Sequence, residues 1–387
     1  MNDKIELEEY PFESQAYKIL PGITDYYCEI HKKNLKSDFP FYTKTEKFND
    51  PVHIKDIFIE ENRFFKYHLI KPAGLKITKK IVFLFHGFNE KNWKKYLPWA
   101  ETICRNTKNS VVLFPIAFHM QRAPEHWSNK REMYKLSEQR KKNYPNILKS
   151  SLSNVAISMR LHSIPQRFIW SGLQTYYDVI QFIENCKKGF YTHISNNFEF
   201  NIFAYSIGGF LAQILKLANH KNYFNHTKVC LFCSGATFNL LSPVSKFILD
   251  SEANATLHSF FVEHFDEILQ KDRLLNHYIN ENHLEGKIFY SMLDYEKMKN
   301  FREKLLKKYE NQIYAITLKK DNVIPSTEVI KTLKGDDCCS INIKVDELDF
   351  NREYTHEDPF PANSKYPNKV AKDFDRVFKK ICDFFLA

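Results

Sequence analysis

Residues 198–219 read FEFNIFAYSIGGFLAQILKLAN, and in this stretch an apolar run breaks at Ala-Tyr-Ser-Ile-Gly-Gly and then resumes with helical spacing. The pattern predicts a strand, a sharp turn and a helix that begins at once. Such a turn lifts the Ser206 hydroxyl above the edge of a sheet and brings Ala204 and Gly208 close together, so both must be small. The backbone N–H of Ile207 would then lie at the helix N-terminus, where it can face a developing oxyanion.

Glycine usage supports this interpretation. Only 10 of the 387 residues are glycine, well below the usual frequency of about 7 %, yet two glycines directly follow Ile207. The second of them, Gly209, would let the helix pack close to the strand. The alternative is an ordinary strand-to-helix connection in which Ser206 serves only as an N-cap.

Composition and charge exclude several classes of protein. No uninterrupted apolar run has the roughly 18 residues that a membrane helix needs, and the acidic N-terminus MNDKIELEEYPFE does not resemble a signal peptide. The net charge of +10 is dispersed, and its densest segment, residues 130–149, is predicted to be a solvated surface helix. We therefore expect a soluble, cytoplasmic protein with no integral membrane segment and no nucleic-acid partner, whose oligomeric state the sequence leaves open.

Short apolar runs alternate with longer helical patterns, which predicts a mostly parallel sheet flanked by helices. Helices are expected at 170–186 and 368–386, and a hairpin at 54–71. Two long intervals, residues 116–169 and 239–308, are interpreted as helical cap insertions, with helical patterns expected at SKFILD and DYEKMKNFREKLLKKYE in the second. The chain is thus expected to be a single α/β domain over 1–387, with an N-terminal extension over about residues 1–50. Besides the strand that leads into Ser206, strands are predicted at 79–87, 109–115, 228–235, 311–318 and 340–348.

A serine nucleophile needs a base within hydrogen-bond reach and an acid that orients the base. After an elbow serine the acid and then the histidine follow along the chain. Asp321 comes shortly after the strand at 311–318, and His356, which follows the last strand, is the only histidine beyond Asp321. The competing acids are Asp336, Asp337, Asp346, Glu347 and Asp349.

The loop HGFNEKNW after the strand at 79–87 is expected to supply a second oxyanion donor. We expect this donor to be the backbone N–H of Phe88, with Asn89 as the weaker candidate, and His86 to shape the turn. The possible pocket-lining residues are Tyr205, Asn89, Arg122 and Trp127. Arg122 has an alternative role in an ion pair with the second insertion.

Metal and cofactor motifs are not evident. The segment HEDPF around His356 has no second histidine at metal-ligand spacing, and neither G-x-G-x-x-G nor G-x-x-x-x-G-K occurs. The C-x-x-C formed by Cys230 and Cys233 lies in an apolar segment that is predicted to be a buried strand, and the cysteines are expected to be reduced. We expect no metal and no cofactor.

Taken together, HGF after a strand, AYSIGG at an elbow, Asp321 in DNVIP and the late His356 resemble the α/β-hydrolase superfamily over about residues 79–235 and 311–386. Ala204 departs from the usual first glycine of the elbow, and Gly87 stands alone where many esterases have H-G-G-G.

This resemblance implies an α/β-hydrolase fold with cap insertions and acyl chemistry on a small molecule. Ser206 would attack a carbonyl, His356 would take its proton and Asp321 would orient the imidazole. The bond would be an ester, a thioester or a related acyl bond. An acyltransferase or a peptidase with the same triad, and a non-catalytic binding protein, are the alternatives.

Overall fold

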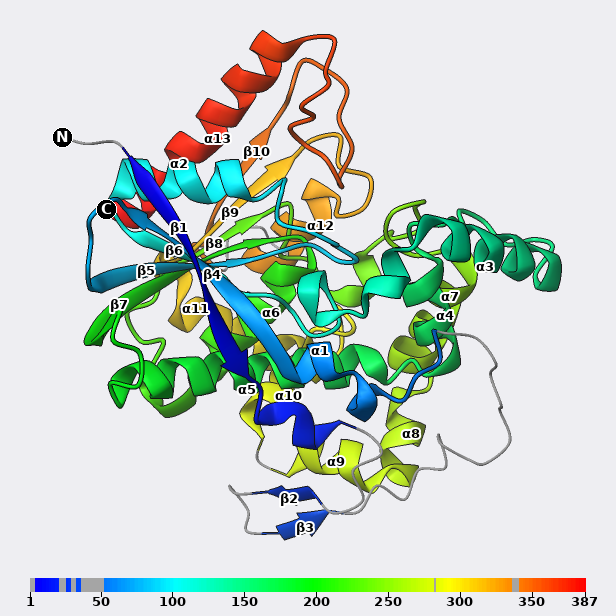
Figure 1. Cartoon of the computed structure of the whole chain (residues 1–387). Helices are drawn as coiled ribbons and strands as arrows, with labels where there is room; N and C mark the ends of the chain where they lie inside the picture. Colours follow the sequence, from blue (N-terminus) through cyan, green and yellow to red (C-terminus); the bar gives the residue numbers. More distant parts are fainter. Residues whose placement is uncertain (1–3, 21–25, 29–32, 36–51, 282, 336–340) are drawn as a thin grey trace.

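The computed structural model describes residues 4–20, 26–28, 33–35, 52–281, 283–335 and 341–387 (Figure 1). Its centre is an eight-stranded sheet with the order β1-β4-β6-β5-β7-β8-β9-β10. All neighbouring strands from β6 to β10 in this order pair in parallel, whereas β4 is antiparallel to both β1 and β6. The strands are β1 (Ile5–Glu13), β4 (Phe64–Pro72), β5 (Thr78–Phe85), β6 (Ser110–Leu113), β7 (Ile194–Tyr205), β8 (Val229–Phe232), β9 (Ile313–Leu318) and β10 (Lys344–Leu348).

Helices cover both faces of this sheet (Figure 1). One face packs against α2 (Leu97–Thr107) and α13 (Pro367–Leu386), with Trp99 and Phe378 in its core. The other face packs against α5 (Arg167–Lys187) and α6 (Ile207–Ala218), with Phe83 and Phe182 in its core. Every residue of β6, β8 and β9 is buried, because parallel strands covered on both faces must be apolar on both sides. The predicted α/β-hydrolase fold is confirmed.

The predicted hairpin over residues 54–71 is wrong. Its first half forms a 3-10 turn (Asp56–Phe58) and the short helix α1 (Glu60–Arg63), and only the second half is a strand, β4. The buried carboxylate of Asp56 explains the difference, because it accepts hydrogen bonds from Arg160 and Arg167 and so holds this segment against other helices. The antiparallel partner of β4 is β1, which comes from the interval interpreted as an N-terminal extension.

The two long intervals fold largely into helices that contact one another. The first contains α3 (Lys130–Asn143) and α4 (Val155–Ser163), and α4 packs against α7 (Ser251–His258) of the second. The guanidinium of Arg140 binds both carboxylate oxygens of Asp250, at 2.7 and 2.9 Å, and so joins the two intervals. The second interval continues with α8 (Phe265–Lys271), α9 (Arg273–Asn280), α10 (Leu284–Ser291) and α11 (Lys299–Lys308), and α12 (Ser326–Lys334) follows β9.

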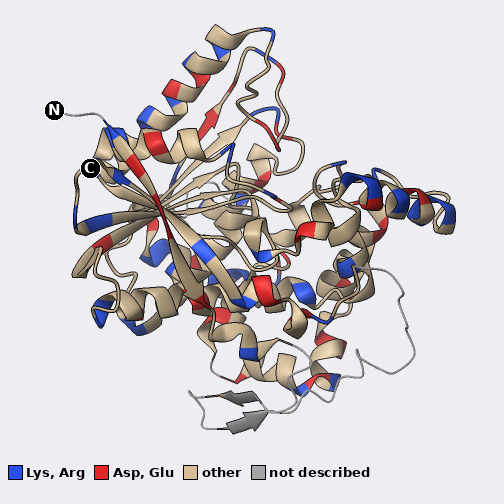
Figure 2. Ribbon diagram, viewed as in Figure 1, with Lys and Arg blue, Asp and Glu red and all other residues tan. Residues whose placement is uncertain are grey.

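Three smaller predictions can be compared with the structure. The helix expected at SKFILD is wrong, because that segment is a turn closed by a bridge between Val244 and Leu249. The predicted surface helix is α3, but it ends at Asn143 instead of continuing to residue 149, and its exposed sides carry many Lys and Arg residues (Figure 2). Cys230 and Cys233 are free and buried, as are Cys104, Cys186 and Cys382. Within the described ranges, no helix has the length and apolar character needed to cross a membrane.

A separate two-stranded sheet lies beside the second interval. It consists of β2 (Tyr26–Cys28) and β3 (Lys33–Leu35), which pair in an antiparallel manner. In Figure 1 it lies next to α9 at the lower edge of the molecule, far from the carboxyl ends of the main strands.

Candidate active site

The turn between β7 and α6 places Ser206 in a rare backbone conformation. Its φ is +55° and its ψ is −127°, a region that costs a non-glycine residue on the order of 1–3 kcal/mol. Ser206 is buried, and its side chain makes no capping hydrogen bond to the helix. The structure therefore contradicts the alternative in which Ser206 acts only as an N-cap.

The two glycines after Ile207 are required by close contacts. A Cβ atom on Gly208 would lie 2.6 Å from the carbonyl oxygen of Phe85 and 2.8 Å from that of His86. A Cβ on Gly209 would lie 2.1 Å from Oγ of Ser234. Because no rotamer change can move a backbone carbonyl aside, Gly208 fixes how closely α6 approaches the end of β5.

Ser206, His356 and Asp321 form a chain of hydrogen bonds. Ser206 Oγ lies 2.7 Å from His356 Nε2, and His356 Nδ1 lies 2.8 Å from Asp321 Oδ2. The other oxygen of Asp321 accepts the backbone N–H groups of Val323 and Ile324 at 2.9 and 3.0 Å. An ionised carboxylate only accepts hydrogen bonds, so the contacts assign the proton to Nδ1 and leave Nε2 to accept from the Ser206 hydroxyl.

The competing acids point elsewhere. Asp346 accepts hydrogen bonds from Tyr314 and Lys380 at 2.6 and 2.7 Å. Glu347 accepts from Ser326, and Asp349 pairs with Lys319. Asp336 and Asp337 lie outside the described residues. Asp321 is the acid that the structure places against His356.

Several neighbours hold the His356 loop in place. The hydroxyl of Tyr205 donates to the carbonyl of His356, and the two rings stack with centroids 5.5 Å apart. Lys95 Nζ donates to the carbonyl of Glu357 at 2.9 Å. Burial and the adjacent Asp321 carboxylate raise the pKa of the Cys233 thiol well above its usual value, so the thiol stays neutral. Neither Lys95 nor Cys233 was predicted to lie near the site. Cys233 could have been, because it directly follows a parallel strand whose carboxyl end lies at the same edge of the sheet as Ser206.

The loop after β5 comes close to Ser206. Neither the N–H of Ile207 nor that of Phe88 has a hydrogen-bond acceptor within the described part of the chain, whereas the N–H of Gly87 donates to the hydroxyl of Tyr96 at 2.8 Å. A Cβ on Gly87 would lie 3.4 Å from Cβ of Ser206, which shows how tightly the loop packs there. The N–H groups of Ile207 and Phe88 are the two that were predicted from the sequence to bind an oxyanion.

His86 has the supporting role that the sequence analysis expected. Its Nδ1 donates to the carbonyl of Gly87 at 2.7 Å, and its Nε2 accepts the N–H of Ile116 at 2.9 Å. Burial lowers the pKa of His86 well below its usual value, so the ring is neutral and fixed in one tautomer. It shapes the loop that carries Phe88.

Ser206 and His356 line a cleft of about 1040 Å³. Three of the expected pocket residues, Tyr205, Asn89 and Trp127, also line it. The Asn89 side chain joins the two long intervals, because its Nδ2 donates to the carbonyls of Ser153 and Phe247 at 2.9 and 2.6 Å.

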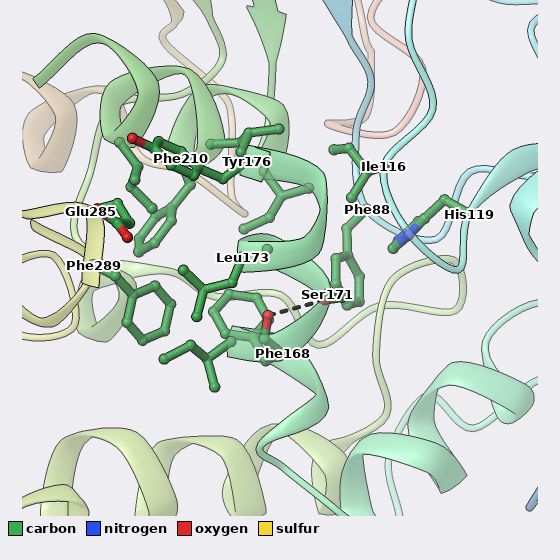
Figure 3. A pocket seen from close by; sticks show the side chains of 15 residues that line it. Phe88, Ile116, His119, Phe168, Ser171, Leu173, Tyr176, Phe210, Glu285 and Phe289 are labelled. Atoms are coloured by element: carbon green, nitrogen blue, oxygen red, sulfur yellow. Dashed lines mark hydrogen bonds between the residues drawn. The ribbon is translucent and has the colours of Figure 1, made fainter. Parts of the chain in front are cut away.

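A smaller apolar cavity of about 50 Å³ adjoins this cleft. Phe88 lines both spaces and Ile207 lines the cavity, so the residues that carry these two N–H groups border the cavity. The other walls come from α5, α6 and α10, including Phe168, Phe210 and Phe289 (Figure 3).

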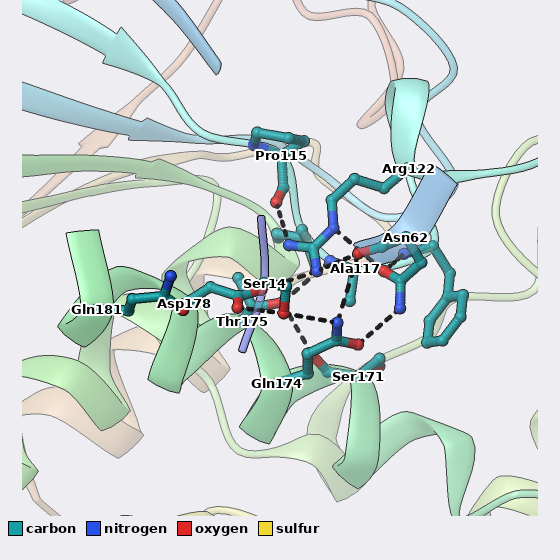
Figure 4. A network of polar contacts seen from close by, with 12 residues as sticks. Ser14, Asn62, Pro115, Ala117, Arg122, Ser171, Gln174, Thr175, Asp178 and Gln181 are labelled. Atoms are coloured by element: carbon teal, nitrogen blue, oxygen red, sulfur yellow. Dashed lines mark hydrogen bonds and ion pairs between the residues drawn. The ribbon is translucent and has the colours of Figure 1, made fainter. Parts of the chain in front are cut away.

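Arg122 does not line either space, so its assignment to the pocket is wrong. Its side chain is fully buried, and its guanidinium pairs with the Asp178 carboxylate at 2.8 Å. The guanidinium also donates to Asn62 Oδ1, to the Asn62 carbonyl and to the Pro115 carbonyl, each at 3.1 Å (Figure 4). The 3-10 turn Met120–Arg122 directs the side chain between α1 and α5, so its ion-pair partner belongs to α5 and not to the second insertion. Burial lowers the pKa of Arg122 and raises that of Asp178, and the pairing of the two charges opposes both shifts.

Comparisons with known proteins give one family and several similar folds. A model described as "Family of unknown function (DUF6051)" matches residues 1–386. No curated protein matches the sequence significantly.

Among solved structures, a carboxyl esterase from Tuber melanosporum is 12 % identical and has a TM-score of 0.45, with 83 % of this chain and 82 % of that chain covered. A structure of fungal esterases from Rhizomucor miehei is 10 % identical with a TM-score of 0.46, and covers 99 % of this chain and 85 % of its own. A vibralactone cyclase is 10 % identical with a TM-score of 0.45, and covers 100 % of this chain and 81 % of its own.

Proposed function

The chain belongs to DUF6051, a family of unknown function, and we propose that it is a serine hydrolase that cleaves an ester, a thioester or a related acyl bond. The observation that carries this proposal is the hydrogen-bonded chain from Ser206 through His356 to Asp321, with links of 2.7 and 2.8 Å. A serine that is strained, next to a base and followed by a helix N-terminus has the features of an activated nucleophile.

Acylation would use each of these groups in turn. Ser206 Oγ attacks the substrate carbonyl carbon while its proton moves to His356 Nε2, and the ionised Asp321 stabilises the imidazolium that forms. The oxyanion accepts hydrogen bonds from the N–H groups of Ile207 and Phe88. Each such donor contributes on the order of a hundred- to a thousand-fold in rate.

The intermediate then collapses in two stages. The bond to the leaving group breaks as His356 returns the proton to the departing oxygen or sulfur, which leaves an acyl ester on Ser206. Water loses a proton to His356 as it attacks this ester, and the acid departs as Ser206 recovers its proton.

The shape of the site favours a division of the substrate between the two spaces. The apolar cavity that Phe88 and Ile207 line suits a short apolar acyl chain, because their N–H groups would hold the oxyanion beside it. The wide cleft would take the leaving group. Its walls carry both lysines and carboxylates, among them Lys91, Lys94, Glu90 and Asp358, which favour a leaving group with polar substituents. We keep a small-molecule substrate and a cytoplasmic location as predictions.

A fluorophosphonate probe tests the proposal without knowledge of the substrate. The full-length protein is treated with the probe and the adduct is located by mass spectrometry. We expect labelling at Ser206, its loss in Ser206→Ala, and its retention in Ser128→Ala, which alters another serine of the same cleft. Failure to label the folded protein, or labelling that persists in Ser206→Ala, would contradict the proposal.

Kinetics with a series of p-nitrophenyl esters provide the second test. Ser206→Ala and His356→Ala should each lower kcat by about 10⁴-fold or more, and the double variant should be little worse than either one, because the residues act as a unit. Losses that multiply in the double variant would contradict the assigned roles.

A further inference from the structure

Three potential metal ligands converge at a site built by the N-terminal segment and the second insertion. Cys28 ends β2, His277 lies in α9, and His283 directly precedes α10. Their ligand atoms all lie within 4.8 Å of one another. The Nε2 atoms of the two histidines are 3.0 Å apart, and Sγ of Cys28 is 3.5 Å from Nε2 of His283. All three residues are at least 98 % buried.

Carboxylates orient both imidazole rings. Nδ1 of His277 lies 3.0 Å from Glu281, and Nδ1 of His283 lies 2.8 Å from Glu285. With Nδ1 of each ring turned to a carboxylate, both Nε2 atoms face the same space. A carboxylate behind each histidine is the usual second shell of a metal site.

We propose that Cys28, His277 and His283 bind a zinc ion. Tetrahedral zinc with Zn–N near 2.05 Å and Zn–S near 2.3 Å places ligand nitrogens about 3.3 Å apart, and nitrogen and sulfur about 3.6 Å apart. The observed separations of 3.0 and 3.5 Å are close to these values. A thiolate with two imidazoles suits zinc and does not suit magnesium or calcium, which take oxygen ligands. On binding, the Cys28 thiol releases its proton to solvent as the Zn–S bond forms.

The ligand spacing in the sequence agrees with this assignment. His277 and His283 have five residues between them, within the range of histidine pairs in zinc sites. The expectation of no metal rests on the segment around His356 and on Cys230 and Cys233. Cys28 and the two histidines are about 250 positions apart, so spacing alone could not connect them.

The ion would fasten the second insertion to the N-terminal segment. Gly286 shows how closely α9 and α10 pack there, because a Cβ on it would overlap the carbonyl of Tyr278. Tyr177 of α5 donates to Glu285, which joins the site to the sheet-covering helices. Glu285 and Phe289 of α10 also line the apolar cavity beside the candidate active site. The role of the zinc is therefore structural, and the cap and the cavity depend on it.

Metal content and cobalt spectroscopy test the site on the full chain. We expect one zinc per chain by inductively coupled plasma mass spectrometry. After exchange, Co²⁺ should show intense visible bands of tetrahedral geometry and a near-ultraviolet thiolate charge-transfer band. Removal of zinc by a chelator should lower the Tm, and addition of zinc should restore it.

Variants then test the individual ligands. Cys28→Ser and His283→Gln should lose stoichiometric zinc, whereas Cys104→Ser, a buried thiol in α2, should keep it. Glu281→Gln should weaken zinc binding by about 10- to 100-fold, as expected for a second-shell carboxylate.

Three results would each overturn the zinc proposal. Wild-type protein that binds zinc no more tightly than micromolar, a cobalt spectrum without the thiolate band, or full zinc content in both Cys28→Ser and His283→Gln would each do so. If these variants fail to fold, the cobalt spectrum and the chelator titration of the wild-type protein decide the question. Labelling of Ser206 by the fluorophosphonate probe is a separate readout, so failure of the zinc proposal and failure of the hydrolase proposal are distinguishable.

Discussion

The substitution Asp321→Asn removes the charge behind His356 and leaves the shape of the loop intact. In the wild-type protein Asp321 Oδ1 accepts two backbone N–H groups at 2.9 and 3.0 Å, and the amide oxygen of asparagine can accept the same two. The amide NH₂ group then replaces Oδ2, which lies 2.8 Å from His356 Nδ1. Two donors cannot share this contact. His356 must therefore change tautomer, so that Nδ1 accepts and Nε2 carries the proton.

This change disables the base. A protonated Nε2 cannot accept the proton of Ser206 Oγ, which lies 2.7 Å away, and the imidazolium also loses its counter-charge. A wrong tautomer of this kind costs about 10⁴-fold in kcat, equivalent to about 5.5 kcal/mol at 1.36 kcal/mol per tenfold. The Tm should change little, because the loop keeps its backbone hydrogen bonds.

The assay measures the rate constant for fluorophosphonate labelling of Ser206, the kcat for a p-nitrophenyl ester and the Tm of each variant. Asp346→Asn is the matched control, because Asp346 is a competing acid that binds Tyr314 and Lys380 instead of His356. A folded Asp321→Asn protein that is labelled within about tenfold of the wild-type rate would refute this reasoning. An equal loss in Asp346→Asn would refute it as well.

Three further substitutions test other parts of the structure. Gly208→Ala should abolish labelling of Ser206, because the new Cβ would lie 2.6 Å from a backbone carbonyl. The control Gly172→Ala lies in α5 with no atom within 4 Å of the new Cβ, and it should raise the free energy of unfolding by about 1 kcal/mol. Arg122→Met should lower that free energy by about 3–5 kcal/mol in urea titrations, because it leaves Asp178 buried without its counter-charge, and the further change Asp178→Leu should restore part of the loss. Phe88→Ala should keep the oxyanion N–H but open the cavity to the cleft, so the ratio of kcat/KM for octanoyl over butanoyl esters should rise by about tenfold.

The central sheet and the order of the candidate triad could be predicted because local patterns encode them. Strands buried on both faces are mostly apolar, so β8, β9 and the second half of β5 are visible as apolar runs. The turn at Ser206 needs small residues at fixed offsets, and in a chain with few glycines these are conspicuous. The order of acid and histidine along the chain then selected Asp321 and His356.

Contacts between distant segments could not be predicted in the same way. The pairing of β1 with β4 depends on a strand that comes about fifty residues earlier, and no local pattern names the partner. Arg122 was expected in the pocket, but a charge buried away from water needs a counter-charge, and only the packing of α5 shows that Asp178 provides it. The backbone of the His356 loop is likewise held by Tyr205 and Lys95, which lie far from it in the sequence.

The sequence by itself thus determined which segments form the sheet, where a strained serine occurs and in what order its candidate partners follow. The tertiary structure decided which acid contacts the histidine, where Arg122 lies and which walls enclose the two spaces beside Ser206. It also decided that Cys28 meets His277 and His283. The physical reason is that periodicity and turn chemistry act over a few residues. Burial of charges and convergence of ligands depend instead on which segments, far apart in the sequence, pack against one another and exclude water.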